Sequence, residues 1–173
     1  MIQLERTTPV ASAPAENAAA ADPALGLLPV WRLADLYPGK DASALKADID
    51  KATTLSKDFE AKWKGRLADA AGKSGPDGIG QALAEFEALE DLLGKIGSFA
   101  GLTYFADTSD PANGKFYGDI QSKLTDLSAH LLFFALELNR IDDAVIDACM
   151  DRDPQAAHYR LWIVDLRQDK PYQ

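Results

Sequence analysis

GSFAGLTYFADTSDP, residues 97–111, places glycines among aromatic residues and then passes into hydroxyls, carboxylates and a proline. Five side chains here could be gathered for catalysis: Tyr104, Asp107, Thr108, Ser109 and Asp110. The stretch could equally end one helix and begin the next. An aspartate cap followed by proline in the first turn is a standard helix opening. We therefore predict a polar turn between a helix ending near Tyr104 or Phe105 and a helix beginning at Asp110 and Pro111.

The helix before this turn is predicted from apolar residues spaced three, four and seven apart, the period of one helix face. Its stripe consists of Ile79, Leu83, Phe86, Leu93 and Ala100, widened by Leu89, Leu92 and Ile96. Gly94, Gly97 and Gly101 interrupt it, and each costs a helix about 1 kcal/mol relative to alanine. We expect close approach of another helix to explain these three glycines.

The same periodicity predicts the remaining helices. A first helix runs from Asp41 towards Ala71 despite Gly65, with Leu45, Ile49, Ala52, Phe59 and Trp63 on one face. The helix beginning at Asp110 continues to about Arg140, and two shorter helices follow at 142–150 and 154–168. No strand of alternating period is present in the sequence. The predicted fold class is all-α, an antiparallel bundle or set of helical hairpins with a long third helix.

Residues 1–29 differ in composition from the rest of the chain. They hold four prolines and many alanines but no periodic large apolar residues. Such a segment cannot bury enough surface to offset its ordering entropy, so we predict a disordered leader. The folded domain is predicted to span residues 30–173, and it begins with a segment that Trp31, Leu33, Leu36 and Tyr37 could anchor on the core.

Composition excludes several classes of partner. The formal net charge of -9 would repel a nucleic-acid backbone, and the longest strongly apolar run, LLFFAL at 131–136, is too short to span a membrane. The N-terminus lacks the apolar run of a signal peptide, and the single cysteine fits a reducing compartment. We therefore expect a cytoplasmic protein without nucleic-acid or membrane partners.

Motif tests identify no catalytic or metal residue. The two histidines, His130 and His158, do not form the His-Glu-x-x-His pattern of helical zinc peptidases, and we assign both to packing or solvent. Cys149 is interpreted as a small buried residue. AGKSG and GPDGIG fail the phosphate-loop and dinucleotide patterns, so their glycines are assigned to linkers. A run of aspartates is interpreted as a solvated acidic face that starts helices: Asp142, Asp143, Asp147, Asp151 and Asp153.

Four stretches together resemble a known family. WRLADLYPG, GSFAGLTYFADTSDP, LSAHLLFFALELNRID and YRLWIVDLRQDKPYQ occur in the order found in the N-terminal part of oligoendopeptidase F, a bacterial relative of the thimet oligopeptidases. The resemblance spans residues 31–173. It implies a zinc metalloendopeptidase that hydrolyses oligopeptides in a deep channel, whose N-terminal helices form part of the channel wall. The zinc ligands and general base of that family belong to a later catalytic domain.

The resemblance transfers no catalytic, metal or substrate-binding residue to this chain, because no His-Glu-x-x-His is present. We expect a chain that ends before the catalytic domain, is inactive alone, and associates with that domain or with itself. The expected association surface is apolar and is supplied by the final helix, with Tyr159, Trp162 and Ile163, and by the glycine-lined helix near Tyr104. Two alternatives stay open: a free-standing acidic helical module that binds a protein partner, and a small enzyme with an unrecognised carboxylate site. The sequence does not identify the peptide preference or the residues that line a channel.

Overall fold

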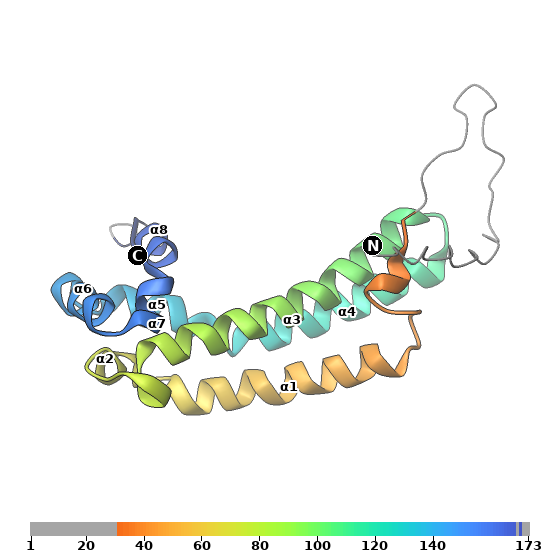
Figure 1. Ribbon diagram of the computed structural model, residues 1–173. Helices are drawn as coiled ribbons and strands as arrows, with labels where there is room; N and C mark the ends of the chain where they lie inside the picture. The colour runs from red at the N-terminus through yellow and green to blue at the C-terminus, as the bar shows by residue number, and fades with distance from the viewer. Residues whose placement is uncertain (1–30, 169, 171–173) are drawn as a thin grey trace, which may run out of the picture. The chain divides into compact units, whose positions relative to one another are not determined.

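The computed structural model describes residues 31–168 and 170, and within them every regular element is helical (Figure 1). The predicted all-α class is confirmed. The chain divides after Arg32 into two units, and the elements below belong to the second, Leu33–Gln173. They are η1 (Leu33–Asp35), α1 (Ser43–Trp63), α2 (Leu67–Ala70), η2 (Gly75–Asp77), α3 (Ile79–Ala106), α4 (Pro111–Ala129), α5 (Leu132–Arg140), α6 (Asp143–Arg152), α7 (Pro154–His158) and α8 (Arg160–Gln168).

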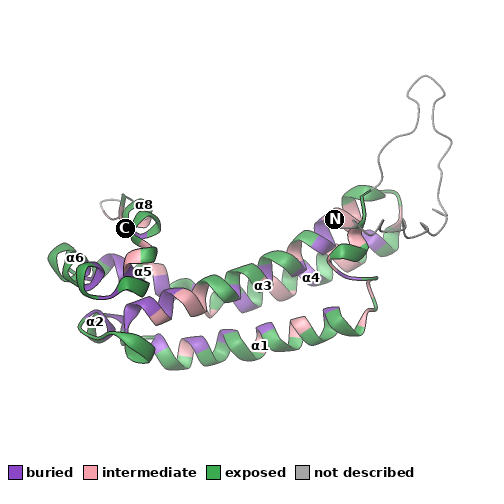
Figure 2. Cartoon of the chain, viewed as in Figure 1, coloured by how far each residue is buried: buried purple, intermediate pink, exposed green. Residues whose placement is uncertain are grey.

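Three long antiparallel helices, α1, α3 and α4, lie side by side and turn apolar stripes towards one another (Figures 1 and 2). The stripe predicted for the first helix is confirmed: Leu45, Ala52, Phe59 and Trp63 are buried, and Ile49 packs at its edge. Asp110 caps α4 as predicted, accepting a hydrogen bond of 2.8 Å from the Ala112 amide.

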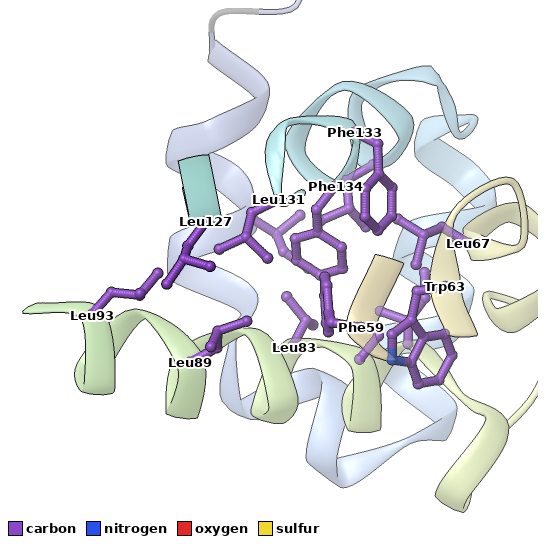
Figure 3. Packing of buried hydrophobic residues seen from close by; sticks show 14 of the residues in the cluster. Phe59, Trp63, Leu67, Leu83, Leu89, Leu93, Leu127, Leu131, Phe133 and Phe134 are labelled. Atoms are coloured by element: carbon purple, nitrogen blue, oxygen red, sulfur yellow. The ribbon is translucent and has the colours of Figure 1, made fainter. Parts of the chain in front are cut away.

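An aromatic cluster joins the long helices to the short helices α5–α8. Phe134 of α5 is fully buried, and its ring centroid lies 5.2 Å from Phe59 and 4.6 Å from Phe86. Figure 3 shows Phe59 and Phe134 converging with Leu83 and Leu131 in this part of the core. Trp162 of α8 joins the same cluster, with its ring centroid 6.4 Å from that of Phe134.

The first helix is shorter than predicted. It ends at Trp63, and Gly65 has a φ of 77°, in the left-handed region that favours glycine. The Gly65 amide donates to both carboxylate oxygens of Glu137 on α5, at 2.8 and 3.0 Å. The turn therefore starts the separate helix α2, where the sequence analysis had extended a single helix towards Ala71.

The third long helix is also shorter than predicted, because a turn at His130 and Leu131 separates α4 from α5 and the predicted extension to about Arg140 is wrong. Phe133 and Phe134 are both buried in α5, which begins directly after this turn. His130 Nδ1 lies 2.5 Å from Glu60 Oε2 on α1. The break thus accompanies a contact between residues distant in sequence, which apolar periodicity does not encode.

The last predicted helix is likewise divided, at Tyr159, into α7 and α8. Burial at the start of the domain also differs from expectation. Tyr37 is buried and its hydroxyl donates to Asp48 at 2.6 Å, but Trp31 is 60% exposed. The predicted leader, residues 1–29, lies outside the described residues.

Glycine packing follows the prediction only in part. A Cβ on Gly97 would lie 3.1 Å from the Leu124 side chain of α4, whereas one on Gly94 would meet open space. The closest approach is at Gly80, where a Cβ would come within 2.7 Å of the Ala156 backbone nitrogen of α7. Gly80 belongs to the GPDGIG stretch that was assigned to a linker. It is a packing residue in the first turn of α3.

Candidate functional site

Residues 107–110 form the turn between α3 and α4, and Tyr104 lies in the last turn of α3. Asp107 accepts hydrogen bonds from the backbone amide and hydroxyl of Ser109, at 3.0 and 2.6 Å, and these bonds hold the pKa of the Asp107 carboxyl below its usual range. Asp110 caps α4, while the Tyr104 ring stacks on Tyr117 at 5.3 Å. The polar groups are used to satisfy backbone and neighbouring donors, as an interhelix turn requires.

Within residues 31–168 and 170, no three His, Cys, Asp or Glu side chains converge to hold a metal ion. His130 faces Glu60, whose pKa is lowered by Lys64 and then by His130. His158 is exposed, and Cys149 is completely buried with its thiol pKa raised by burial. The described residues therefore do not fit a zinc site.

Most of the acidic run predicted to be a solvated face has specific partners. Asp142 and Asp153 cap α6 and α7 by accepting hydrogen bonds from the amides of Ala144 and Gln155. Asp151 pairs with Arg160 at 2.7 Å. The helix-starting role is confirmed for the two caps, but Asp153 is only 5% exposed and lies against Gly80, so it does not belong to a solvated face.

Arg167 connects α8 to α5 and α6 by binding two backbone carbonyls and one carboxylate. Its guanidinium donates to the carbonyls of Leu138 and Ile141 at 2.7 and 2.6 Å, at the C-terminal end of α5, and it also pairs with Asp143 of α6. Arg167 and Lys170 hold the pKa of Asp143 below its usual range. We call Arg167 with its three acceptors the arginine staple. Beside it, a pocket of about 560 Å³ lies between α6 and α8 over Ile146, Met150 and Ile163.

A second pocket, of about 330 Å³, lies between α3 and α7–α8, and we call it the acidic-aromatic pocket. Its lining residues are Leu83, Phe86, Glu87, Glu90, Asp91, Tyr159 and Trp162. The Phe86 and Trp162 ring centroids are 5.8 Å apart. The Tyr159 hydroxyl donates to Glu87 at 2.7 Å, and burial together with this bond raises the pKa of Tyr159 to about 12.

Partial desolvation raises the pKa of the Glu90 carboxyl above its usual range. Neither Glu90 nor Asp91 forms an ion pair or a side-chain hydrogen bond with any other residue of the described ranges 31–168 and 170. Basic residues of α1, α3 and α8 pair elsewhere: Lys62 with Glu85, Lys95 with Asp48, and Arg160 with Asp151. Aromatic rings and carboxylates thus meet at a concave surface, the arrangement expected of a site for a cation.

Sequence reasoning missed this pocket. Glu87, Glu90 and Asp91 follow the i, i+3, i+4 spacing that places side chains on one helix face, and this was the available signal. Tyr159 and Trp162, which complete its aromatic lining, come from the turn before α8 and from α8, more than 60 residues later, so the pocket required the tertiary structure. Trp162 and Tyr159 had been interpreted only as parts of an association surface.

Comparison with known proteins relates the end of the chain to a peptidase family. Residues 137–173 match the N-terminal model of peptidase family M3, described as Oligopeptidase F. No curated protein and no solved structure matches the chain. The matched segment includes the last residues of α5 and all of α6, α7 and α8. Among the helices of residues 31–168 and 170, none combines the length and apolar character needed to cross a membrane.

Proposed function

We propose that this chain is the N-terminal helical portion of a zinc metallopeptidase that hydrolyses oligopeptides, that it forms part of the substrate-channel wall, and that it is inactive alone. The observation that carries the proposal is the family match at residues 137–173. The matched helices are packed into the helical domain: Gly80 of α3 contacts α7, and Arg152 of α6 donates to the Ala71 carbonyl at 2.7 Å. This packing supports the proposal that the long helices belong to the same N-terminal portion as the matched segment.

The catalytic zinc in this proposal is held outside the described residues, which offer no converging ligand set. The first test is the reading frame that follows the codon for Gln173, where an encoded His-Glu-x-x-His would support the proposal. The second test combines the chain with the separately expressed downstream polypeptide and follows a quenched oligopeptide. We expect chelator-sensitive cleavage by the mixture and none by residues 1–173. Cleavage or one equivalent of tightly held zinc in the isolated chain would contradict the proposal.

The interface with the rest of the enzyme is proposed to include the outer side of α8. Leu161 is 82% exposed and Val164 is 53% exposed, whereas Ile163, expected from the sequence to contribute to this surface, is buried. Exposed apolar side chains favour association when they form a continuous patch. We expect the double substitution Leu161→Glu, Val164→Glu to weaken self-association in light scattering and copurification with the downstream polypeptide. Leu55→Glu, at an exposed position of α1, is the control that should change neither.

A free-standing binding module is the second candidate function, and the acidic-aromatic pocket favours it because a pocket can bind a partner without a catalytic domain. A stop codon directly after Gln173, together with a monomeric chain that has no affinity for other M3 peptidase segments, would favour this candidate. It shares the predicted lack of peptide hydrolysis, so the reading frame and the association measurement distinguish the two functions.

A further inference from the structure

We infer that the acidic-aromatic pocket between α3 and α7–α8 binds the side chain of an arginine from a peptide or protein segment. The inference stands apart from the peptidase proposal, because it uses only the side chains that line the pocket. A volume of about 330 Å³ is at the lower end of the range for small-molecule sites and is sufficient for one long side chain.

The aromatic wall provides the surface on which the cation would stack. Trp162 is 39% exposed, and its ring packs against Phe134 with centroids 6.4 Å apart, so part of the indole is accessible while part contacts the core. Phe86 adds a second ring, tilted by 48° relative to Trp162. Tryptophan is the best aromatic partner for a cation, and a planar guanidinium can stack on its face.

The carboxylates provide the charge complement. Glu87 is oriented by the Tyr159 hydroxyl, which fills one acceptor site and leaves the others open. Glu90 and Asp91 lack a cationic partner within residues 31–168 and 170, and desolvation of Glu90 already raises the free energy of its charged form. A cation in the pocket would supply these carboxylates with a charge partner. Arginine is favoured over lysine because its fork can meet two carboxylate oxygens while its plane stacks.

The test uses the full chain of residues 1–173 and the blocked peptide acetyl-Gly-Arg-Gly-amide, with the indole N–H resonance of Trp162 as the reporter. The chain has three tryptophans, and Trp162→Phe identifies the resonance. We expect saturable shifts with a dissociation constant on the order of 1 mM. The citrulline peptide, which keeps the shape but lacks the charge, should bind at least about tenfold more weakly, corresponding to about 1.4 kcal/mol.

The double variant Glu90→Gln, Asp91→Asn should weaken arginine-peptide binding by about fivefold to tenfold, since it removes two exposed charges whose pairing with the cation is individually weak. Asp126→Asn is the matched control, because it removes an exposed charge from α4, away from the pocket, and should leave the affinity unchanged. Circular dichroism should confirm that all variants keep the parent helix content.

Three results would overturn the inference. The first is the absence of a Trp162 shift at about 10 mM peptide, well above the expected dissociation constant. The second is equal affinity for the arginine and citrulline peptides, or equal affinity in the pocket and control variants. The third is tighter binding of spermidine than of the arginine peptide, which would show that the pocket selects charge alone and not a guanidinium side chain. Peptide hydrolysis does not enter any of these measurements, so they are independent of the proposed peptidase function.

Discussion

The long helices α1, α3 and α4 and the short helices α5–α8 are stabilised in different ways. The long helices have 21, 28 and 19 residues and meet through apolar stripes. The short helices have only 5 to 10 residues, below the length at which isolated helices are stable in water. They depend on aspartate caps and on arginines that bind backbone carbonyls, such as Arg167 and Arg152. The segment that matches the peptidase family lies mostly in the second region.

Because the two regions are stabilised in different ways, a substitution should destabilise mainly the region in which it lies. A substitution where the two regions meet should destabilise both. Phe134 is such a position, since it contacts Phe59 of α1, Phe86 of α3 and Trp162 of α8. We predict that Phe134→Ala costs about 3 to 5 kcal/mol in the free energy of unfolding, through lost burial and a cavity.

Urea denaturation followed by circular dichroism would measure this effect. Phe105→Ala is the control, because Phe105 is 62% exposed at the end of α3 and should cost less than about 1 kcal/mol. If the two substitutions shift the unfolding midpoint equally, the aromatic cluster does not join the two regions as proposed.

The sequence predicted the long-helix region better than the short-helix region for a physical reason. Apolar periodicity arises because one face of a helix meets the core, and a helix cap depends on adjacent residues. The stripe of α1 and the cap at Asp110 could therefore be predicted from neighbouring residues alone. The breaks at Gly65 and His130 accompany contacts with Glu137 and Glu60, about 70 residues away in each case. A local pattern cannot contain these partners, and uninterrupted helices were predicted in their place.

The same limit applies to the candidate site. The carboxylates of Glu87, Glu90 and Asp91 share a face of α3, and their spacing was visible in the sequence. Tyr159 and Trp162 lie beside them only in the folded domain, where α8 packs against α3. Gly80 illustrates the converse error. It was assigned to a linker because it stands in a glycine-rich stretch, although the approach of α7 gives it a packing role.

The second prediction tests the arginine staple of the short helices. Arg167→Ala removes donors from two backbone carbonyls and from Asp143, and the Arg167 side chain is only 11% exposed. We expect a loss of about 2 to 3 kcal/mol, because charged hydrogen bonds contribute about 1.5 to 3 kcal/mol and the carbonyls lose their partner. Hydrogen exchange should rise first in α5, α6 and α8.

Arg160→Ala is the matched control in the same helix. Its pair with Asp151 is exposed on both sides, so the expected loss is below about 1 kcal/mol. The loss of stability for Arg167→Lys should fall between the losses for Arg160→Ala and Arg167→Ala, because an ammonium cannot reproduce the planar fork of the guanidinium. Equal losses for Arg160→Ala and Arg167→Ala would contradict a structural role for the staple, as would faster exchange confined to α1.

The third prediction compares two glycines of one helix. Gly80→Ala should destabilise the chain by about 1 to 3 kcal/mol, because its Cβ would press on the backbone of α7. Gly94→Ala should stabilise it by about 0.5 to 1 kcal/mol, because alanine has the higher helix propensity and the position is open. Thermal unfolding would show shifts of opposite sign. A neutral Gly80→Ala would mean that α7 can move away from α3 without cost.

The smallest expected effect concerns an ion pair within the long-helix region. Asp48 of α1 accepts hydrogen bonds from the Tyr37 hydroxyl at 2.6 Å and from Lys95 of α3 at 2.9 Å. These bonds, that of Tyr37 first, hold the pKa of Asp48 below its usual range. A carboxyl with a depressed folded-state pKa contributes stability that is present above its unfolded pKa of about 3.9 and is lost as the pH falls through the folded value.

Asp48→Asn should therefore cost about 1 kcal/mol at neutral pH, and its difference from the parent chain should shrink as the pH falls below about 3.9 and be lost once the pH lies below the folded-state pKa, where the parent carboxyl is protonated. Urea denaturation at steps between neutral pH and pH 3 would measure the difference. Asp126→Asn, at an exposed position of α4, serves as the control and should show no comparable change with pH. If the difference in the free energy of unfolding between Asp48→Asn and the parent chain stays constant or grows on acidification, Asp48 stabilises the fold through its shape and not through its charge. In that case the long helices would depend on packing alone, and the contrast with the arginine-held short helices would be sharper than we propose.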